Sequence, residues 1–120
     1  MEKAQDAKRF AHTLGVEFTA AALAMKYQAD VTDAQIAGLL HDCAKCLTDE
    51  KRVSICEKHR IPMTDIERRN PFLLHAKVGE YLAREKYGIT NPDILNAIRF
   101  HTTGRENMSL LERIVFVADY

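Results

Sequence analysis

The segment Ile36-Ala37-Gly38-Leu39-Leu40-His41-Asp42-Cys43 joins an apolar helical repeat to two polar residues. Its apolar side chains recur at intervals of three and four, as on one face of an α-helix: Ile36, Leu39, Leu40 and Cys43. His41 and Asp42 end the apolar run, and adjacent helical residues diverge by about 100°. The segment therefore predicts a buried helix that offers two ligand side chains to neighbouring points.

The rest of the chain shows the same helical pattern. Apolar residues repeat at helical spacing in residues 78–82, 94–98 and 111–118, and no stretch alternates with period two long enough to make a strand. Helix starts are indicated by capping-box patterns at Thr32-x-x-Gln35, Thr64-x-x-Glu67 and Ser109-x-x-Glu112, and by Asn91-Pro92. Gly88 and Gly104 are placed as helix-terminating glycines. We expect an all-α bundle of roughly six to seven helices.

Composition limits the classes of protein to which the chain can belong. Its 120 residues fit one domain, with 47% hydrophobic and 28% charged residues, which is typical of a folded globular protein. Seventeen basic against seventeen acidic residues leave no global positive field, so nucleic-acid binding is not expected. No apolar run approaches the roughly 20 residues of a membrane span, and the charged residues 1–10 do not resemble a signal peptide. These features favour a cytoplasmic protein without a membrane partner.

The cysteines support the same compartment. Cys43, Cys46 and Cys56 are an odd number of closely spaced thiols, which makes a poor disulfide framework. Cys43 and Cys46 form a C-x-x-C pair, but no second pair accompanies it and no strand precedes it, so a redox role is disfavoured. We expect Cys43 to pack in the core and His59, which has charged neighbours on both sides, to face solvent.

Histidines and aspartates fall on faces that should be buried. His101 follows Ile94 and Ile98 at helical spacing, and Asp119 follows Val115 in the same way. One such histidine is usually a hydrogen-bonded core residue. A buried carboxylate, however, costs on the order of several kcal/mol unless it is paired or binds a metal. A shared metal site removes this cost for the whole set, which comprises His12, His41, Asp42, His75, His101 and Asp119. Six ligands favour two ions, for which iron, manganese and zinc are suitable.

The ordered set H…HD…H…H…D resembles the signature of the HD-domain phosphohydrolase superfamily. Five local blocks are similar to the bacterial YqeK family: residues 9–16 (RFAHTLGV), 37–45 (AGLLHDCAK), 74–75 (LH), 96–105 (NAIRFHTTGR) and 108–120, which begins MSLL and ends ADY. The resemblance implies that residues 1–120 form an HD domain that lacks its natural C-terminal end. It also implies a symmetrical diadenosine tetraphosphate hydrolase with two metal ions, iron preferred, in which a metal-activated water releases two ADP.

The resemblance also assigns roles to individual residues. It implies that Asp42 bridges the ions, that His12, His41 and Asp119 complete one site, and that His75 and His101 complete the other. Asp42 and Lys45 are the expected catalytic residues. The residues expected to bind substrate are Arg9, Thr13, Lys45, Thr102, Thr103, Gly104 and Arg105. Residues 67–69 are interpreted as a solvated charged face that could rim a pocket for an anionic substrate.

Other functions remain open from the sequence. A second HD activity, such as a nucleotide phosphatase or phosphodiesterase, would use the same ligands on a different substrate. A nucleotide-binding module would hold a nucleotide without cleaving it, and a structural role for the metals would make them necessary for folding. Association into a homodimer is a further open alternative.

Overall fold

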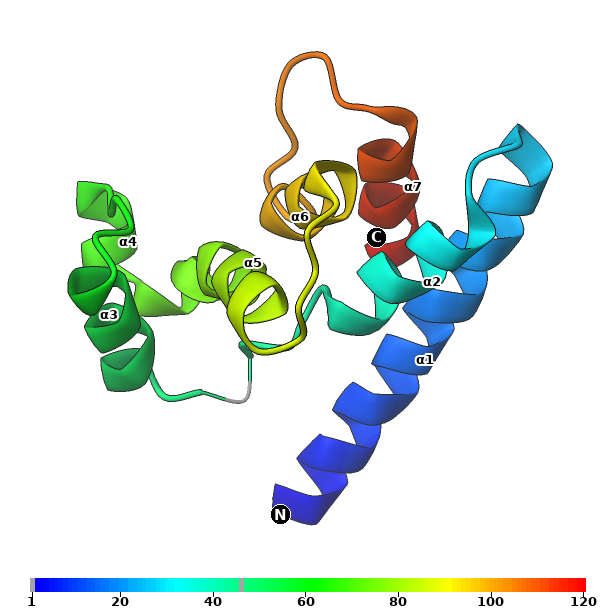
Figure 1. Ribbon diagram of the computed structural model, residues 1–120. Coiled ribbons are helices and arrows are strands. Elements are labelled where there is room, and N and C mark those ends of the chain that lie inside the picture. Colours follow the sequence, from blue (N-terminus) through cyan, green and yellow to red (C-terminus); the bar gives the residue numbers. More distant parts are fainter. Residues whose placement is uncertain (1, 46) are drawn as a thin grey trace.

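The computed structural model describes residues 2–45 and 47–120, which form an all-helical fold (Figure 1). Within these residues there are seven α-helices, one 3-10 helix and no strand, which confirms the predicted fold class. The elements are α1 (Glu2–Tyr27), α2 (Val31–Leu40), α3 (Asp49–Lys58), α4 (Asp65–Arg69), η1 (Pro71–Leu74), α5 (His75–Glu85), α6 (Pro92–Arg99) and α7 (Leu110–Asp119). Along the described part of the chain, no helix is both long and apolar enough to cross a membrane.

Most of the helix starts agree with the sequence analysis. Thr64 and Ser109 each begin a complete capping box, and the Asn91 side chain accepts a hydrogen bond from the Asp93 N–H at 2.9 Å. The prediction at Thr32 is wrong. Asp30 caps α2 by accepting from the Asp33 N–H at 2.9 Å, so the helix begins one residue before Thr32. Aspartate is at least as good an N-cap as threonine, and it comes first along the chain.

At the helix ends, the prediction for the two glycines is confirmed and the helical placement of His101 is wrong. Gly88 and Gly104 both adopt positive φ, at +67° and +66°, as expected of glycines that end helical segments. His101, however, does not lie within α6. The helix stops at Arg99, and Phe100 leaves helical geometry with φ −105° and ψ 13°. His101 occupies the following turn, where it is still buried.

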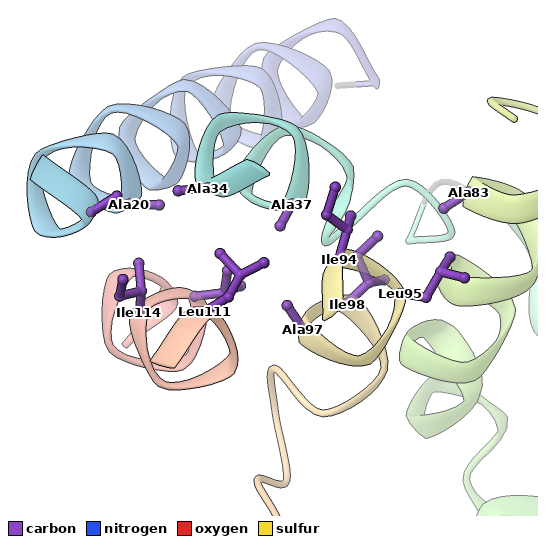
Figure 2. Close-up of a cluster of buried hydrophobic side chains, with 12 residues drawn as sticks. Ala20, Ala34, Ala37, Ala83, Ile94, Leu95, Ala97, Ile98, Leu111 and Ile114 are labelled. Atoms are coloured by element: carbon purple, nitrogen blue, oxygen red, sulfur yellow. The ribbon is translucent and has the colours of Figure 1, made fainter. Parts of the chain in front are cut away.

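The helices lie side by side in a row, and two clusters of apolar side chains fill the space between them. Figure 1 shows α1, α2 and α7 on one side, α6 and α5 in the middle, and α3 and α4 on the other side. In Figure 2, alanines of α1 and α2 face larger side chains of α6 and α7, including Ile98 and Ile114. A second cluster joins α3 to α5 through Cys56 and Val78. This packing brings the C-terminal ends of α2, α6 and α7 close to the start of α5.

Cys43 is less buried than predicted, because it lies beyond the end of α2 rather than in the core. Cys43 lies just beyond the end of α2 and is half-buried, with its Sγ 3.6 Å from the carbonyl oxygen of Gly79. Cys46 is outside the described residues, so the C-x-x-C motif stays a sequence observation. His59 is exposed, as expected.

Candidate metal centre

Five separate parts of the fold supply the candidate ligands. His12 lies on α1, His41 and Asp42 directly follow α2, His75 is the first residue of α5, His101 follows α6, and Asp119 is the last residue of α7. The structure brings all of these side chains into two overlapping groups. The first group is His12, His41, Asp42 and Asp119, and the second is Asp42, His75 and His101. Within each group, one potential ligand atom per residue lies within 4.8 Å of the others.

The first group is centred on carboxylate oxygens. Asp119 Oδ1 lies 2.8 Å from His12 Nε2 and 3.1 Å from His41 Nε2. Asp42 Oδ2 lies 3.1 Å from His41 Nε2 and 3.8 Å from His12 Nε2. His12 is the most accessible member, with 44% of its side chain exposed, whereas the His41 side chain is fully buried. The group is therefore open to solvent on the side of α1.

The second group uses the other oxygen of Asp42. Asp42 Oδ1 lies 3.4 Å from His101 Nε2, and His101 Nε2 lies 3.3 Å from His75 Nε2. All three residues are buried. Because Oδ1 faces this group and Oδ2 faces the first, Asp42 is placed to be shared by two ions.

The three buried histidines are oriented in the same way. Each places Nδ1 against the backbone carbonyl three residues earlier, at 2.6 Å for His41, 2.9 Å for His75 and 2.5 Å for His101. A carbonyl oxygen only accepts, so Nδ1 must carry the proton and donate it. In the neutral ring, the lone pair is then on Nε2, which points into the cluster. This is the arrangement by which proteins orient histidine ligands toward a metal.

The charge balance of the cluster favours bound cations. Both carboxylate oxygens of Asp42 are buried and lack a hydrogen-bond partner, and the nearest full positive charge is the Lys45 ammonium, 3.1 Å from Oδ2. A buried carboxylate is destabilising unless positive charge compensates it, and bound cations would add such charge. Several imidazole nitrogens surround it, and nitrogen and oxygen donors together suit divalent transition metals. The residues therefore fit two divalent ions.

The pKa shifts show the same negative potential. Burial by itself lowers the pKa of His41, but contacts with Asp119 and Asp42 outweigh it and raise the pKa to about 9. Burial raises the pKa of Asp42, yet the close imidazoles of His101 and His41 hold that pKa well below its usual range. The pKa of Asp119 falls to about 2, because His41 and His12 outweigh the effect of burial. Burial instead lowers the pKa of His75, so the negative potential is strongest in the first group, around His41 and the two carboxylates.

Lys45 lies at the edge of the cluster. Its Nζ is 3.1 Å from Asp42 Oδ2, and 26% of its side chain is exposed. The ammonium group is thus held beside the candidate metal ligands while remaining accessible from solvent. This location is compatible with the predicted contact to a substrate phosphate, which stays a prediction.

Arg105 has a structural contact that the sequence did not indicate. Its Nε and Nη2 donate to the two carboxylate oxygens of Glu112 at 2.8 and 2.9 Å, and its guanidinium lies over the Phe100 ring at 4.4 Å. Two donors of the fork are therefore occupied by a buried carboxylate. The predicted phosphate contact of Arg105 depends on the donors that remain, and it stays a prediction.

The other expected substrate residues are sequence neighbours of two candidate ligands, His12 and His101. Thr102 and Thr103, which directly follow His101 in the sequence, line a small pocket of about 110 Å³. Gly104 forms the positive-φ turn that follows them. Arg9 and Thr13 are half-buried on α1, one turn before His12 and directly after it. The structure does not test their roles in binding.

Arg52 is a buried residue that the sequence analysis missed. It is 3% exposed, donates to the carbonyl oxygens of Ala44 at 3.3 Å and Lys45 at 3.0 Å, and lies over the Phe72 ring at 5.2 Å. It therefore connects the loop that carries Lys45 to the turn whose Phe72 carbonyl orients His75. Its spacing of four from the buried Cys56 was the available signal.

Comparison with known proteins finds relatives that match most of this chain. The chain is 47% identical over 112 residues to the symmetrical bis(5'-nucleosyl)-tetraphosphatase of Halalkalibacterium halodurans, covering 93% of this chain and 59% of the relative. The Bacillus subtilis protein of the same name is 44% identical over 112 residues, covering 93% of this chain and 60% of the relative. The chain thus spans about 60% of the length of these relatives.

A solved structure shows the same fold. It is described as a predicted HD superfamily hydrolase involved in NAD metabolism from Clostridium acetobutylicum. It superposes with a TM-score of 0.90 at 52% sequence identity, covering 94% of this chain and 60% of that chain. The resemblance inferred from the sequence blocks is therefore confirmed. Because residues 9–120 match the family description "HD domain", this chain belongs to the HD-domain family.

Proposed function

We propose that this chain is a metal-dependent phosphohydrolase that cleaves dinucleoside tetraphosphates symmetrically and converts diadenosine tetraphosphate into two ADP. The observation that carries the metal-dependent part is the buried Asp42 carboxylate, which has one oxygen facing each of two ligand groups. The substrate class is supported by the names of the relatives from Halalkalibacterium halodurans and Bacillus subtilis.

The proposed cofactors are two divalent ions, with iron preferred and manganese or zinc as alternatives. His12, His41 and Asp119 would hold one ion together with Asp42, and His75 and His101 would hold the other with the same carboxylate. When bound, such ions supply an activated water and offset the charge that develops on phosphoryl oxygens. The second group has one protein ligand fewer than the first, so an ion held there would have more room to bind a phosphate oxygen.

The protein residues then position the reactants. Asp42 is held rigidly by burial and orients the nucleophile between the two groups. Attack by the water oxygen on one of the two central phosphorus atoms breaks its bond to the central bridging oxygen, and both products are ADP. Lys45, 3.1 Å from Asp42 and partly exposed, places its ammonium where it can neutralise a nonbridging phosphate oxygen.

The product pattern tests this proposal directly. The protein is loaded anaerobically with ferrous iron, and separately with manganese and zinc, before diadenosine tetraphosphate is added and the nucleotides are resolved by chromatography. ADP as the sole product supports symmetrical cleavage. ATP plus AMP would refute the symmetrical reaction but keep the enzyme. Metal-loaded protein that leaves the substrate intact would refute catalysis and favour a binding module.

A matched pair of variants tests the role of Asp42. Asp42→Asn keeps the shape of the side chain but removes the shared charge, so bound metal should fall and turnover should drop by roughly a hundredfold or more. Asp65→Asn makes the same chemical change at an exposed position on α4 and should leave both unchanged. Equal metal content and equal turnover in the two variants would contradict the proposed centre.

A further inference from the structure

The outward face of α5 forms one wall of a second, larger pocket. Lys77, Glu80, Tyr81 and Arg84 repeat at helical spacing along this face, opposite the segment that begins at His59. The pocket has a volume of about 260 Å³. None of these residues belongs to the candidate metal centre.

Positive charge gathers in this pocket although the whole chain has zero net charge. Arg60, Lys77, Arg84 and Arg99 line it, and Glu80 is the only acidic residue of its lining among the described residues. Lys77 is already engaged, because its Nζ donates to Glu67 Oε1 and to the Pro62 carbonyl oxygen at 2.8 Å each, so the three arginines supply the available charge. Glu80 lies 3.6 Å from Arg84 and 3.7 Å from Arg99, so it forms only long ion pairs with them. The guanidinium groups therefore keep donors and charge for an anionic ligand.

An aromatic surface lies beside these cations. The exposed His59 ring stacks on Tyr81, with ring centroids 4.4 Å apart and planes 29° apart. The Tyr81 hydroxyl also lies 2.8 Å from His59 Nε2, which holds the two rings together. A flat ring pair next to guanidinium groups suits a ligand that combines a nucleobase with phosphates.

The pocket shares two lining residues with the smaller pocket described above. Lys77 and Arg99 also line the smaller pocket that contains Thr102 and Thr103. These two threonines directly follow His101 in the sequence. The two pockets therefore adjoin at the Lys77 and Arg99 side chains.

We propose that this basic pocket, lined by His59, Arg60, Lys77, Tyr81, Arg84 and Arg99, binds one nucleoside diphosphate half of the substrate. The inference rests on the proposed function and extends it. A substrate that is cut between two equal halves places one half on each side of the reacting phosphorus. The metal centre neutralises the middle of the polyphosphate, and the pocket supplies cations and a stacking surface for one end.

Direct binding of ADP to the metal-stripped protein tests the pocket without requiring catalysis. The test variant is the double substitution Arg60→Gln and Arg84→Gln, which changes two exposed side chains. Loss of each guanidinium should weaken ADP binding about fivefold, or roughly twenty-five-fold together. Arg113→Gln removes the same charge from an exposed site on α7 and should bind ADP like the wild type. Absence of ADP binding, or equal affinity in both variants, would overturn the proposal.

Two further measurements test whether the pocket recognises a nucleobase and whether it contributes to catalysis. His59→Ala should weaken ADP binding but leave pyrophosphate binding unchanged, and equal effects on both ligands would refute base stacking. With metals bound, the double variant should raise KM for diadenosine tetraphosphate with little change in kcat. If the double variant is active and keeps the wild-type KM and the wild-type affinity for ADP, the proposed pocket is refuted and the proposed function still stands. If the double substitution weakens ADP binding but the wild-type protein does not hydrolyse diadenosine tetraphosphate, the proposed function is refuted and the pocket still stands.

Discussion

Gly38 provides a sharp test of how the packing of α1 and α2 supports the metal centre. A Cβ atom at this position would lie 2.9 Å from the Cα of Glu17, 3.2 Å from its backbone nitrogen and 3.3 Å from the carbonyl oxygen of Val16. All three atoms belong to the backbone of α1, so no side chain can rotate away. Gly38→Ala must therefore push the two helices apart.

The size of the effect follows from two opposing terms. Overpacking of a tight interface costs roughly 1–3 kcal/mol, whereas alanine gains about 1 kcal/mol over glycine inside a helix. Separating the helices also loosens the neighbouring alanine contacts at Ala20 and Ala34. We expect Gly38→Ala to lower the free energy of unfolding by about 1–2 kcal/mol. Gly15 on α1 is the matched control, because its Cβ would meet no atom within 4 Å. Gly15→Ala should stabilise the protein by about 0.5–1 kcal/mol.

The same displacement should reach the first ligand group. His12 is carried by α1, and the Gly38 carbonyl accepts the hydrogen bond from His41 Nδ1 at 2.6 Å. Separation of the helices should therefore move His12 away from Asp119 and weaken binding of one ion. Urea denaturation of both variants, with metal analysis, measures the two effects. Equal stabilisation by the two alanine substitutions, or full metal content in Gly38→Ala, would refute this reasoning.

Three other predictions concern stability and metal removal. Arg52→Met removes the donor to the Lys45 carbonyl and one of the two donors to the Ala44 carbonyl, so urea denaturation should show a loss of about 1–3 kcal/mol, and unchanged stability would contradict this. Arg105 pairs with Glu112 and lowers the pKa of that carboxyl, so this contribution to stability is complete above the ordinary glutamate pKa and is lost as pH falls through the lowered one. Glu112→Gln should therefore flatten the fall in Tm between about pH 5 and pH 3, and parallel Tm curves would argue against the pairing. Chelation should abolish hydrolysis while the far-ultraviolet circular dichroism stays helical, because the apolar clusters do not include the metal ligands; unfolding on chelation would instead indicate structural metals.

The helical architecture was predictable because its signals are local. A capping box such as Ser109-x-x-Glu112 satisfies the first N–H groups of its own helix, and apolar spacing determines which face is buried. The errors were local as well. The start of α2 was misplaced because Asp30 competes with Thr32 as a cap, and His101 was placed in a helix that ends at Arg99. Neither error separates the candidate ligands, because His101 stays buried in the turn that follows Arg99. His12 differs from the expectation of a buried face, since 44% of its side chain is exposed.

The sequence by itself thus determined the helices, the apolar faces and the set of candidate ligands. The resemblance already implied a shared Asp42, and the tertiary structure adds that one of its oxygens faces each ligand group. Only the tertiary structure decided that Arg105 is engaged by Glu112 and that Arg52 contacts both the Lys45 carbonyl and the Phe72 ring. These contacts depend on distances between residues far apart in the chain, such as the 2.8 Å between His12 and Asp119. Periodicity specifies which way a side chain points from its own helix, but helix packing determines what it meets there.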